Sequence, residues 1–159
     1  MLLLLSTAYA QNTSCPCCAE AYRGFDFWLG DWTVHDTTGK QVGTNLIQYM
    51  HDSCVIQENY ANAKGYTGTS YNFYNAADSS WNQTWVDNQG GSLILKGRVK
   101  EGKMVMHSNM LPSPKGGKYF HEIIWYSTEK GTVMQVWKVF KEDGNLIQLA
   151  FKGEYRRKE

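Results

Sequence analysis

The chain has 159 residues, which is enough for one domain with a sizeable core. Its 16 Lys and Arg against 15 Asp and Glu give a formal net charge of +1, and neither sign forms a long run, so nucleic acid is not expected as a partner. No apolar run approaches ~20 residues, so no integral membrane segment is expected. Aromatic residues are spread throughout the chain, which excludes disorder for most of it.

The first ten residues are typical of the end of a secretory signal peptide. Met1 to Leu5 is an apolar run, and Ala8 and Ala10 form an A-x-A cleavage site before Gln11. The basic n-region is missing, so the start is expected to lie inside a longer signal. We therefore expect a signal peptide over 1–10, a cysteine-rich segment over 11–24 and one domain over 25–159, in a periplasmic or secreted protein.

Cysteine usage agrees with export. Cys15, Cys17 and Cys18 are crowded together, and Cys54 is far along the chain. A zinc site usually needs two spaced pairs of Cys or His ligands, and the second pair is absent, so no metal is expected. In an oxidising compartment, a disulfide from the cluster to Cys54 is the simpler interpretation. Cys18 is the favoured partner because it is nearest the folded part.

The rest of the chain is typical of consecutive antiparallel strands. Runs with period two are separated by short turns rich in Gly, Asn and Asp, which leave no room for crossover helices. The expected strands are Trp32–His35, Val42–Tyr49, Cys54–Tyr60, Tyr66–Tyr74, Trp81–Asp87, Ser92–Lys100, Lys103–Met110, Tyr119–Ser127, Thr132–Phe140 and Ile147–Arg156.

About ten hairpin-linked strands would leave exposed edges unless the sheet closes. The sequence therefore predicts an all-β fold, an up-and-down antiparallel β-barrel of about ten strands, with a two-sheet sandwich as the alternative. The stretch Ala19–Leu29 is the only helical candidate, and it is expected to plug one end. The Gly-rich segment Lys115-Gly116-Gly117 is expected to be a mobile loop.

Alternation predicts which side chains line the barrel. Gln83 and Trp85 share a face with Trp81, and the last strand places Ile147 and Leu149 on the face of its later inward residues, Phe151, Gly153 and Tyr155. The inward sets mix large aromatics with uncharged polar groups, which suits a ligand with both kinds of surface. The alternative is that the polar residues point outward. The candidate ligand-binding residues are Asn45, Glu58, Ser70, Asn72, Gln83, Trp85, His121, Trp125, Gln135 and Trp137.

The motifs together resemble a largely uncharacterised family of secreted bacterial proteins with a lipocalin-like barrel. The resemblance rests on Phe25-Asp26-Phe27-Trp28-Leu29-Gly30-Asp31-Trp32, Gly43-x-Asn45-x-Ile47, Gly68-x-Ser70-x-Asn72-x-Tyr74 and Trp81-x-Gln83-x-Trp85-Val86-Asp87, and it covers almost the whole mature chain. Gly30-x-Trp32 with Arg156 or Arg157 also resembles the calycin signature, in which the Arg covers the Trp at the barrel end. Similar members often have a cysteine before the first motif and one near Cys54, which supports the disulfide, while Cys15 and Cys17 depart from that pattern.

Catalytic motifs are scarce. The chain has no Gly-x-Ser-x-Gly elbow, phosphate loop or His-Glu-x-x-His. His121 is the one plausible inward histidine, and related barrels that bind haem use a late histidine. A lone histidine on an apolar face is more often a core residue, so neither haem nor another cofactor is expected. Glu58 with His121 could form an acid–base pair.

We therefore expect an exported, lipocalin-like barrel, monomeric or homodimeric, that binds a small aromatic or amphipathic molecule. One alternative is a small barrel enzyme that uses Glu58 and His121 as acid and base. The other is a structural or protein-binding module whose barrel is filled by its own side chains.

Overall fold

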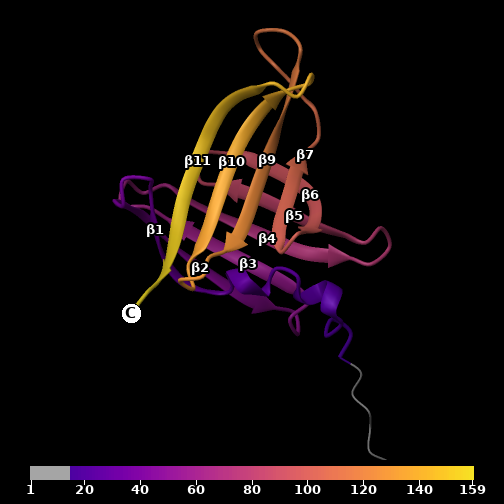
Figure 1. Cartoon of the computed structure of the whole chain (residues 1–159), viewed down its shortest axis with the longest axis vertical. Helices are drawn as coiled ribbons and strands as arrows, with labels where there is room; N and C mark the ends of the chain where they lie inside the picture. Colours follow the sequence, from indigo (N-terminus) through magenta and orange to yellow (C-terminus); the bar gives the residue numbers. More distant parts are fainter. Residues whose placement is uncertain (1–14) are drawn as a thin grey trace, which may run out of the picture.

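The computed structural model describes residues 15–159, so the expected signal peptide lies outside the described part of the chain. Eleven strands form one antiparallel sheet (Figure 1). They are β1 (Gly30–His35), β2 (Gln41–Met50), β3 (Val55–Ala61), β4 (Thr67–Asn75), β5 (Ser80–Asp87), β6 (Ser92–Lys100), β7 (Lys103–Ser108), β8 (Leu111–Pro112), β9 (Lys118–Ser127), β10 (Val133–Lys141) and β11 (Leu146–Arg157).

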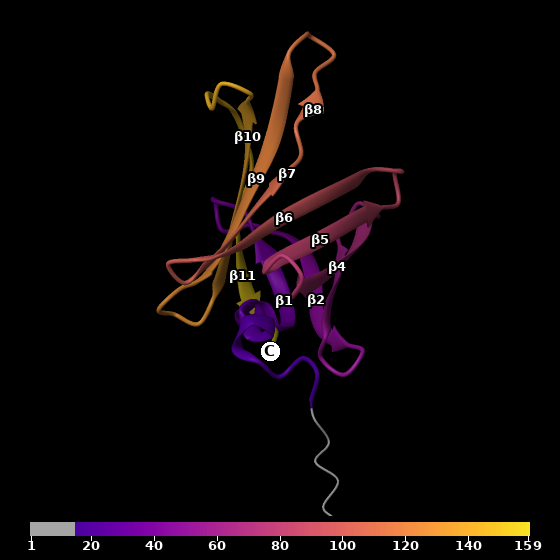
Figure 2. The ribbon, with the colours of Figure 1, turned by 90° about the vertical axis from the view of Figure 1, so that its right-hand side faces the viewer.

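The sheet closes on itself. Successive strands pair as antiparallel neighbours, β7 pairs with β9, and β11 returns to pair with β1. This gives a closed barrel of ten strands, as the sequence predicts, with the short β8 as an extra strand on β9. Closure removes the long unpaired edges that an open meander would expose. The upper ends of β9, β10 and β11, together with β8, rise beyond β1 to β7 (Figures 1 and 2).

The segment before β1 plugs one end of the barrel, although not as the single helix expected over Ala19–Leu29. It forms two 3-10 helices, η1 (Glu20–Arg23) and η2 (Asp26–Trp28), which lie beneath the strands (Figure 2). Gly24 separates the two and lies so close to β6 that a Cβ there would meet the Val99 side chain at 2.8 Å. The break therefore brings the chain close to the barrel wall.

Aromatic rings fill this plugged end. Phe25 and Trp28 are fully buried and stack with ring centroids 4.8 Å apart, and Phe25 also contacts Trp125 edge-on. Trp81 at the start of β5 donates a hydrogen bond to the Ala21 carbonyl at 3.2 Å. The closed end is thus a dry aromatic core in which the plug is tied to the wall.

Trp32 joins the plug to the first and last strands. Its indole Nε1 donates to the Trp28 carbonyl at 2.9 Å, and its ring is buried. The Arg157 guanidinium lies 4.5 Å from the centre of that ring, close enough for a cation–π contact. Gly30 has φ +148°, and a Cβ there would collide with the Arg157 side chain, so this packing requires glycine.

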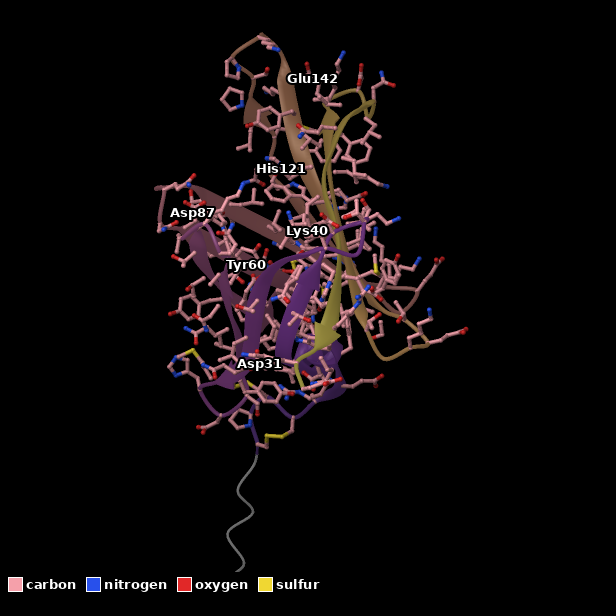
Figure 3. The ribbon with its side chains drawn as sticks, turned by 90° about the vertical axis from the view of Figure 1, so that its left-hand side faces the viewer. Asp31, Lys40, Tyr60, Asp87, His121 and Glu142 are labelled. Atoms are coloured by element: carbon pink, nitrogen blue, oxygen red, sulfur yellow. A yellow bond between two sulfur atoms is a disulfide. The ribbon has the colours of Figure 1, made fainter. Side chains whose placement is uncertain are left out.

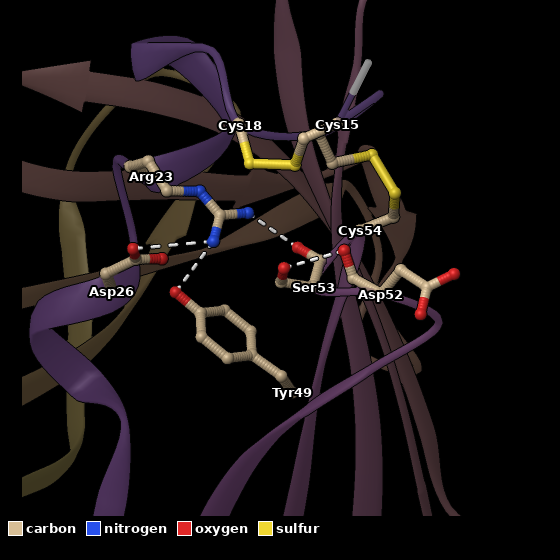
Figure 4. Close-up of a disulfide and its surroundings, with 9 residues drawn as sticks. Cys15, Cys18, Arg23, Asp26, Tyr49, Asp52, Ser53 and Cys54 are labelled. Atoms are coloured by element: carbon tan, nitrogen blue, oxygen red, sulfur yellow. Dashed lines mark hydrogen bonds and ion pairs between the residues drawn. A yellow bond between two sulfur atoms is a disulfide. The ribbon is translucent and has the colours of Figure 1, made fainter. Parts of the chain in front are cut away.

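Two disulfides hold the cysteine-rich segment: Cys17–Cys54 and Cys15–Cys18 (Figure 4). The expected link from the cluster to Cys54 is confirmed, but Cys18 as its partner is wrong. The reason is a turn in which the Cys18 amide donates to the Cys15 carbonyl at 3.4 Å. This turn brings Cys18 back to Cys15 and leaves the buried Cys17 to reach Cys54.

The β2–β3 turn that leads into Cys54 has an unusual backbone. His51, Asp52 and Ser53 all have positive φ, at 50°, 54° and 64°, a region that residues other than Gly rarely adopt in succession. Arg23 from η1 clamps this turn, with one guanidinium nitrogen donating to the Ser53 carbonyl at 2.6 Å and another to the Tyr49 hydroxyl at 2.8 Å (Figure 4). The clamp and the disulfide together hold the strained turn against the plug.

The last strand departs from simple alternation. The register between β10 and β11 shifts twice, once after Trp137 and once after Val139. Each irregularity adds a residue and changes which side chains face inward. Ile147 and Leu149 therefore lie outside, at 51% and 50% exposed, and their expected inward position is wrong. Gly153 and Tyr155 lie in the part of β11 where the register with β10 is regular, and both are buried as expected.

Candidate ligand-binding cavity

A cavity of about 250 Å³ lies inside the barrel, toward the end away from the plug. Strand β5 shows the direction: Trp81 at its start contacts the plug, Gln83 and Trp85 line the cavity, and Asp87 at its end accepts a hydrogen bond from Tyr66 at 3.0 Å. The lining residues are Glu58, Tyr60, Tyr66, Gln83, Trp85, Leu93, Ile123, Trp125, Gln135, Trp137, Ala150, Phe151 and Tyr155.

The walls are mainly aromatic. Trp85 comes from β5, Trp125 from β9 and Trp137 from β10, and Tyr60 and Phe151 add rings from β3 and β11. Gly68 on β4 makes room for one of these rings, because a Cβ at that position would overlap the Trp85 indole. Aromatic faces on several sides of one cavity suit a flat or ring-bearing occupant, or a cation.

A continuous polar network supports one side of the cavity. Glu58 accepts hydrogen bonds from Asn45 Nδ2 and from Ser70 Oγ, each at 2.7 Å. Asn72 Nδ2 donates to Ser70 Oγ at 2.9 Å, and Gln83 Nε2 donates to Asn72 Oδ1 at 2.7 Å. All five side chains are buried, so the polar residues of β2 to β5 point inward as alternation predicts.

Glu58 is a buried acid without a basic partner among the residues that the structure describes. It is only 6% exposed, and burial raises its pKa to about 7, while the hydrogen bonds from Ser70 and Asn45 oppose that rise. Burial also raises the pKa of the neighbouring Tyr60 and Tyr155 hydroxyls, and the charge of Glu58 adds to both effects. Near neutral pH the carboxyl group can therefore hold or release a proton.

Five buried side-chain atoms lack a hydrogen-bond partner within residues 15–159: Trp125 Nε1 on a lining residue, Asn45 Oδ1 in the network behind the cavity, and Arg23 Nε, Asp26 Oδ1 and Trp28 Nε1 in the plug. Tyr155 donates its hydroxyl proton to Gln135 Oε1, which leaves the Gln135 amide nitrogen as a donor on the cavity wall. A buried donor without an acceptor costs on the order of 1–3 kcal/mol. Two residues of the cavity wall, Trp125 and Gln135, thus carry a donor without a partner among the described residues.

The structure divides the candidate residues into three groups. Six of them reach the cavity: Glu58, Gln83, Trp85, Trp125, Gln135 and Trp137. Asn45, Ser70 and Asn72 are fully buried behind it, where they hold Glu58 and Gln83 in place. His121 belongs to neither group.

His121 lies on the part of β9 that rises toward Glu142, above the level of Tyr60 (Figure 3). Its Nδ1 accepts a hydrogen bond from Trp137 Nε1 at 2.9 Å, and burial lowers its pKa. Within residues 15–159 no hydrogen bond joins it to Glu58, and β3 and β9 are not neighbours in the barrel. His121 instead orients Trp137, one of the cavity walls.

Several lining residues were not among the candidates. Alternation does place Tyr60, Ile123 and Tyr155 on the inward faces of their strands, although they were not named as ligand-binding candidates. Leu93 pairs directly with Trp85 across β5 and β6, which only the register reveals. Ala150 reaches the cavity beside the β11 irregularity and has no sequence signal.

No three His, Cys, Asp or Glu side chains of the described segment gather as a metal site would. Of the helices within residues 15–159, none is long and apolar enough to cross a membrane. Comparison of the chain with models of known protein families and with curated proteins found no match.

Proposed function

We propose that this protein is an exported, lipocalin-like barrel that binds a small molecule in its cavity. The observation that carries the proposal is a space of about 250 Å³ that joins three tryptophans to a buried, unpaired carboxyl group. Binding sites for small molecules are concave, mostly apolar and supplied with a few placed polar groups. Because usual sites hold roughly 300–1,000 Å³, the ligand is compact, with one or two rings.

Two features support the finer parts of the proposal. The contact between Arg157 and Trp32 beside Gly30 resembles the end closure of calycin barrels. Two disulfides in a chain of this size favour an oxidising compartment, which agrees with the signal peptide expected over 1–10.

A second candidate function is general acid–base catalysis by Glu58. A pKa of about 7 lets a carboxyl group exchange a proton near neutral pH, and Glu58 reaches the cavity. The acid–base pair of Glu58 with His121 that the sequence suggested loses its support, because His121 accepts a hydrogen bond from Trp137 instead. The open space also argues against a barrel filled by its own side chains.

Tryptophan fluorescence can test the binding proposal. A library of compact one-ring and two-ring compounds is titrated into the mature protein, and a ligand that stacks on the cavity wall should quench emission. Trp85→Leu should weaken binding by the lost stacking, about 0.5–1.5 kcal/mol or roughly 2- to 10-fold. Thr84→Ala is the matched control, because Thr84 is exposed on the same strand.

Equal affinities for the wild-type protein and Trp85→Leu would place the ligand elsewhere and count against the proposal. The catalytic candidate has its own criterion. A Glu58→Gln variant that binds the same compound but no longer turns it over would favour an enzyme, whereas binding without turnover by both proteins would favour a carrier.

A further inference from the structure

We propose that the cavity takes an organic cation, a protonated amine on a compact ring, with its ammonium group beside Glu58 and its ring between the tryptophans. This inference rests on the binding function proposed above and names the chemical class of the ligand. It follows from three properties of the site: its uncompensated acid, its aromatic walls and its spare hydrogen-bond donors.

The charge is the first property. Of the described residues that line the cavity, none is Lys, Arg or His, and Glu58 is the one acid. Its two oxygens accept from neutral donors alone, Asn45 Nδ2 and Ser70 Oγ. Isolated charges are costly to bury, and an opposite charge within a few ångströms relieves that cost. A cationic ligand supplies the missing partner, whereas an anionic one would meet Glu58 with no base to balance it.

The walls are the second property. Tyr60, Trp85, Trp125 and Trp137 surround the same space as Glu58, and Phe151 and Tyr155 add further rings. The faces of aromatic rings attract ammonium groups, and Trp does so most strongly. A neutral or anionic ligand would gain ring stacking from these walls, but a cation gains the electrostatic attraction as well.

Spare donors are the third property. Both Trp125 and Gln135 line the cavity; Trp125 Nε1 is buried without a partner among the described residues, and the amide nitrogen of Gln135 makes no hydrogen bond within them. These groups call for an acceptor on the ligand. The ammonium therefore sits at Glu58, and a hydroxyl, ether or carbonyl oxygen elsewhere on the ligand meets the donors of β9 and β10.

Three probes of similar shape test the charge: 2-phenylethylamine, 3-phenyl-1-propanol and 3-phenylpropionate. Calorimetric titration at about pH 8, where Glu58 is mostly ionised, should show the amine binding about tenfold or more tightly than the alcohol, with the carboxylate weakest. Glu58→Gln should reduce the amine to the affinity of the alcohol, and Glu129→Gln, at an exposed turn, should leave the preference intact.

The pH dependence supplies a second measurement that needs no variant. Between about pH 8 and pH 6 the preference for the amine should shrink as Glu58 gains a proton. The other titratable groups that face Glu58 are the Tyr60 and Tyr155 hydroxyls, whose pKa values are raised above 10 and which stay neutral over this range. A change in preference over this interval therefore reports Glu58.

Each result has a definite consequence. Equal binding of amine and alcohol, tighter binding of the carboxylate, or an amine preference that survives in Glu58→Gln would overturn the cation inference while the binding function stands. Failure of all three probes to bind would also overturn it. The binding function itself would fall only if the wider fluorescence screen gave no ligand that depends on Trp85.

Discussion

Both ends of the barrel are rich in aromatic side chains, but the rings pack against one another at the plugged end and line a cavity toward the other end. At the plugged end, Phe25 stacks on Trp28 and Trp32 packs edge-on against Tyr155, and all of these rings are buried. At the other end, Trp85 and Trp137 face open space and are backed by buried polar side chains. Aromatic side chains therefore supply stability where they pack against one another, and where they line the cavity they form the binding surface that we propose.

This contrast also concerns polar groups. At the plugged end two indoles donate to backbone carbonyls, Trp32 to Trp28 and Trp81 to Ala21, while Trp28 Nε1 has no partner among residues 15–159. The open end connects side chain to side chain, from Asn45 through Glu58 and Ser70 to Gln83. Networks of buried side chains are costly unless fully satisfied, and this one contains a carboxyl group without a counter-charge among the described residues.

The largest expected effect tests the plugged end. Trp32→Ala should lower the free energy of unfolding by about 3–5 kcal/mol, because it removes a large buried ring and its contacts with Arg157 and Tyr155. Urea denaturation measures the change. Trp85→Ala is the matched comparison at the open end and should cost clearly less, since that ring is half-buried. Equal costs would erase the distinction between the two ends.

The next effect concerns the attachment of the plug. The double variant Cys17→Ser/Cys54→Ser should lose about 2–4 kcal/mol, since this bridge spans 37 residues and also holds the strained turn before Cys54. The Cys15–Cys18 disulfide spans a sequence separation of only 3, so the double variant Cys15→Ser/Cys18→Ser should lose less stability. Peptide mapping of non-reduced protein should recover Cys54 joined to Cys17; a Cys54–Cys18 fragment would contradict the structure.

The smallest of the three effects depends on pH. Burial raises the pKa of Glu58 from 4.5 to about 7, so the folded state binds its proton more tightly than the unfolded state does. The resulting stability is complete below about pH 4.5 and is lost as the pH rises through about 7, a decrease of at most about 3 kcal/mol.

Urea denaturation of the wild-type protein and Glu58→Gln between about pH 4.5 and pH 8 measures this effect, because the variant lacks the titrating group. The wild-type protein should lose stability relative to the variant across this interval. Identical pH profiles would mean that Glu58 is not desolvated. Glu129→Gln is the exposed control and should follow the wild-type profile.

Much of the fold could be predicted from the sequence because its signals are local. Period-two alternation and Gly-rich turns located the ten long strands to within about two residues, and the inward position of Ser70, Asn72 and Gln83 follows from the same period. Closure followed from the number of short connections. The two-residue β8 has no such signal, because it is too short for alternation to show, contains Pro112 and is followed by Pro114.

The rest depended on contacts between distant residues. Ile147 and Leu149 obey the alternating pattern, but the irregular pairing of β11 with β10 turns them outward. Cys17 rather than Cys18 reaches Cys54 because of a turn that only the folded plug defines. Likewise, nothing in the sequence places His121 on the part of β9 that rises above the level of Tyr60 (Figure 3).

Gly68 determines where the Trp85 ring can lie in the cavity wall. The Trp85 indole lies over this residue, in space that any β-carbon would occupy. The shape of the cavity therefore depends on the absence of a side chain at Gly68 of β4 as well as on the Trp85 ring that lines it. A methyl group at position 68 would force the Trp85 ring to shift and so change the shape of the cavity, although residue 68 is not one of its lining residues.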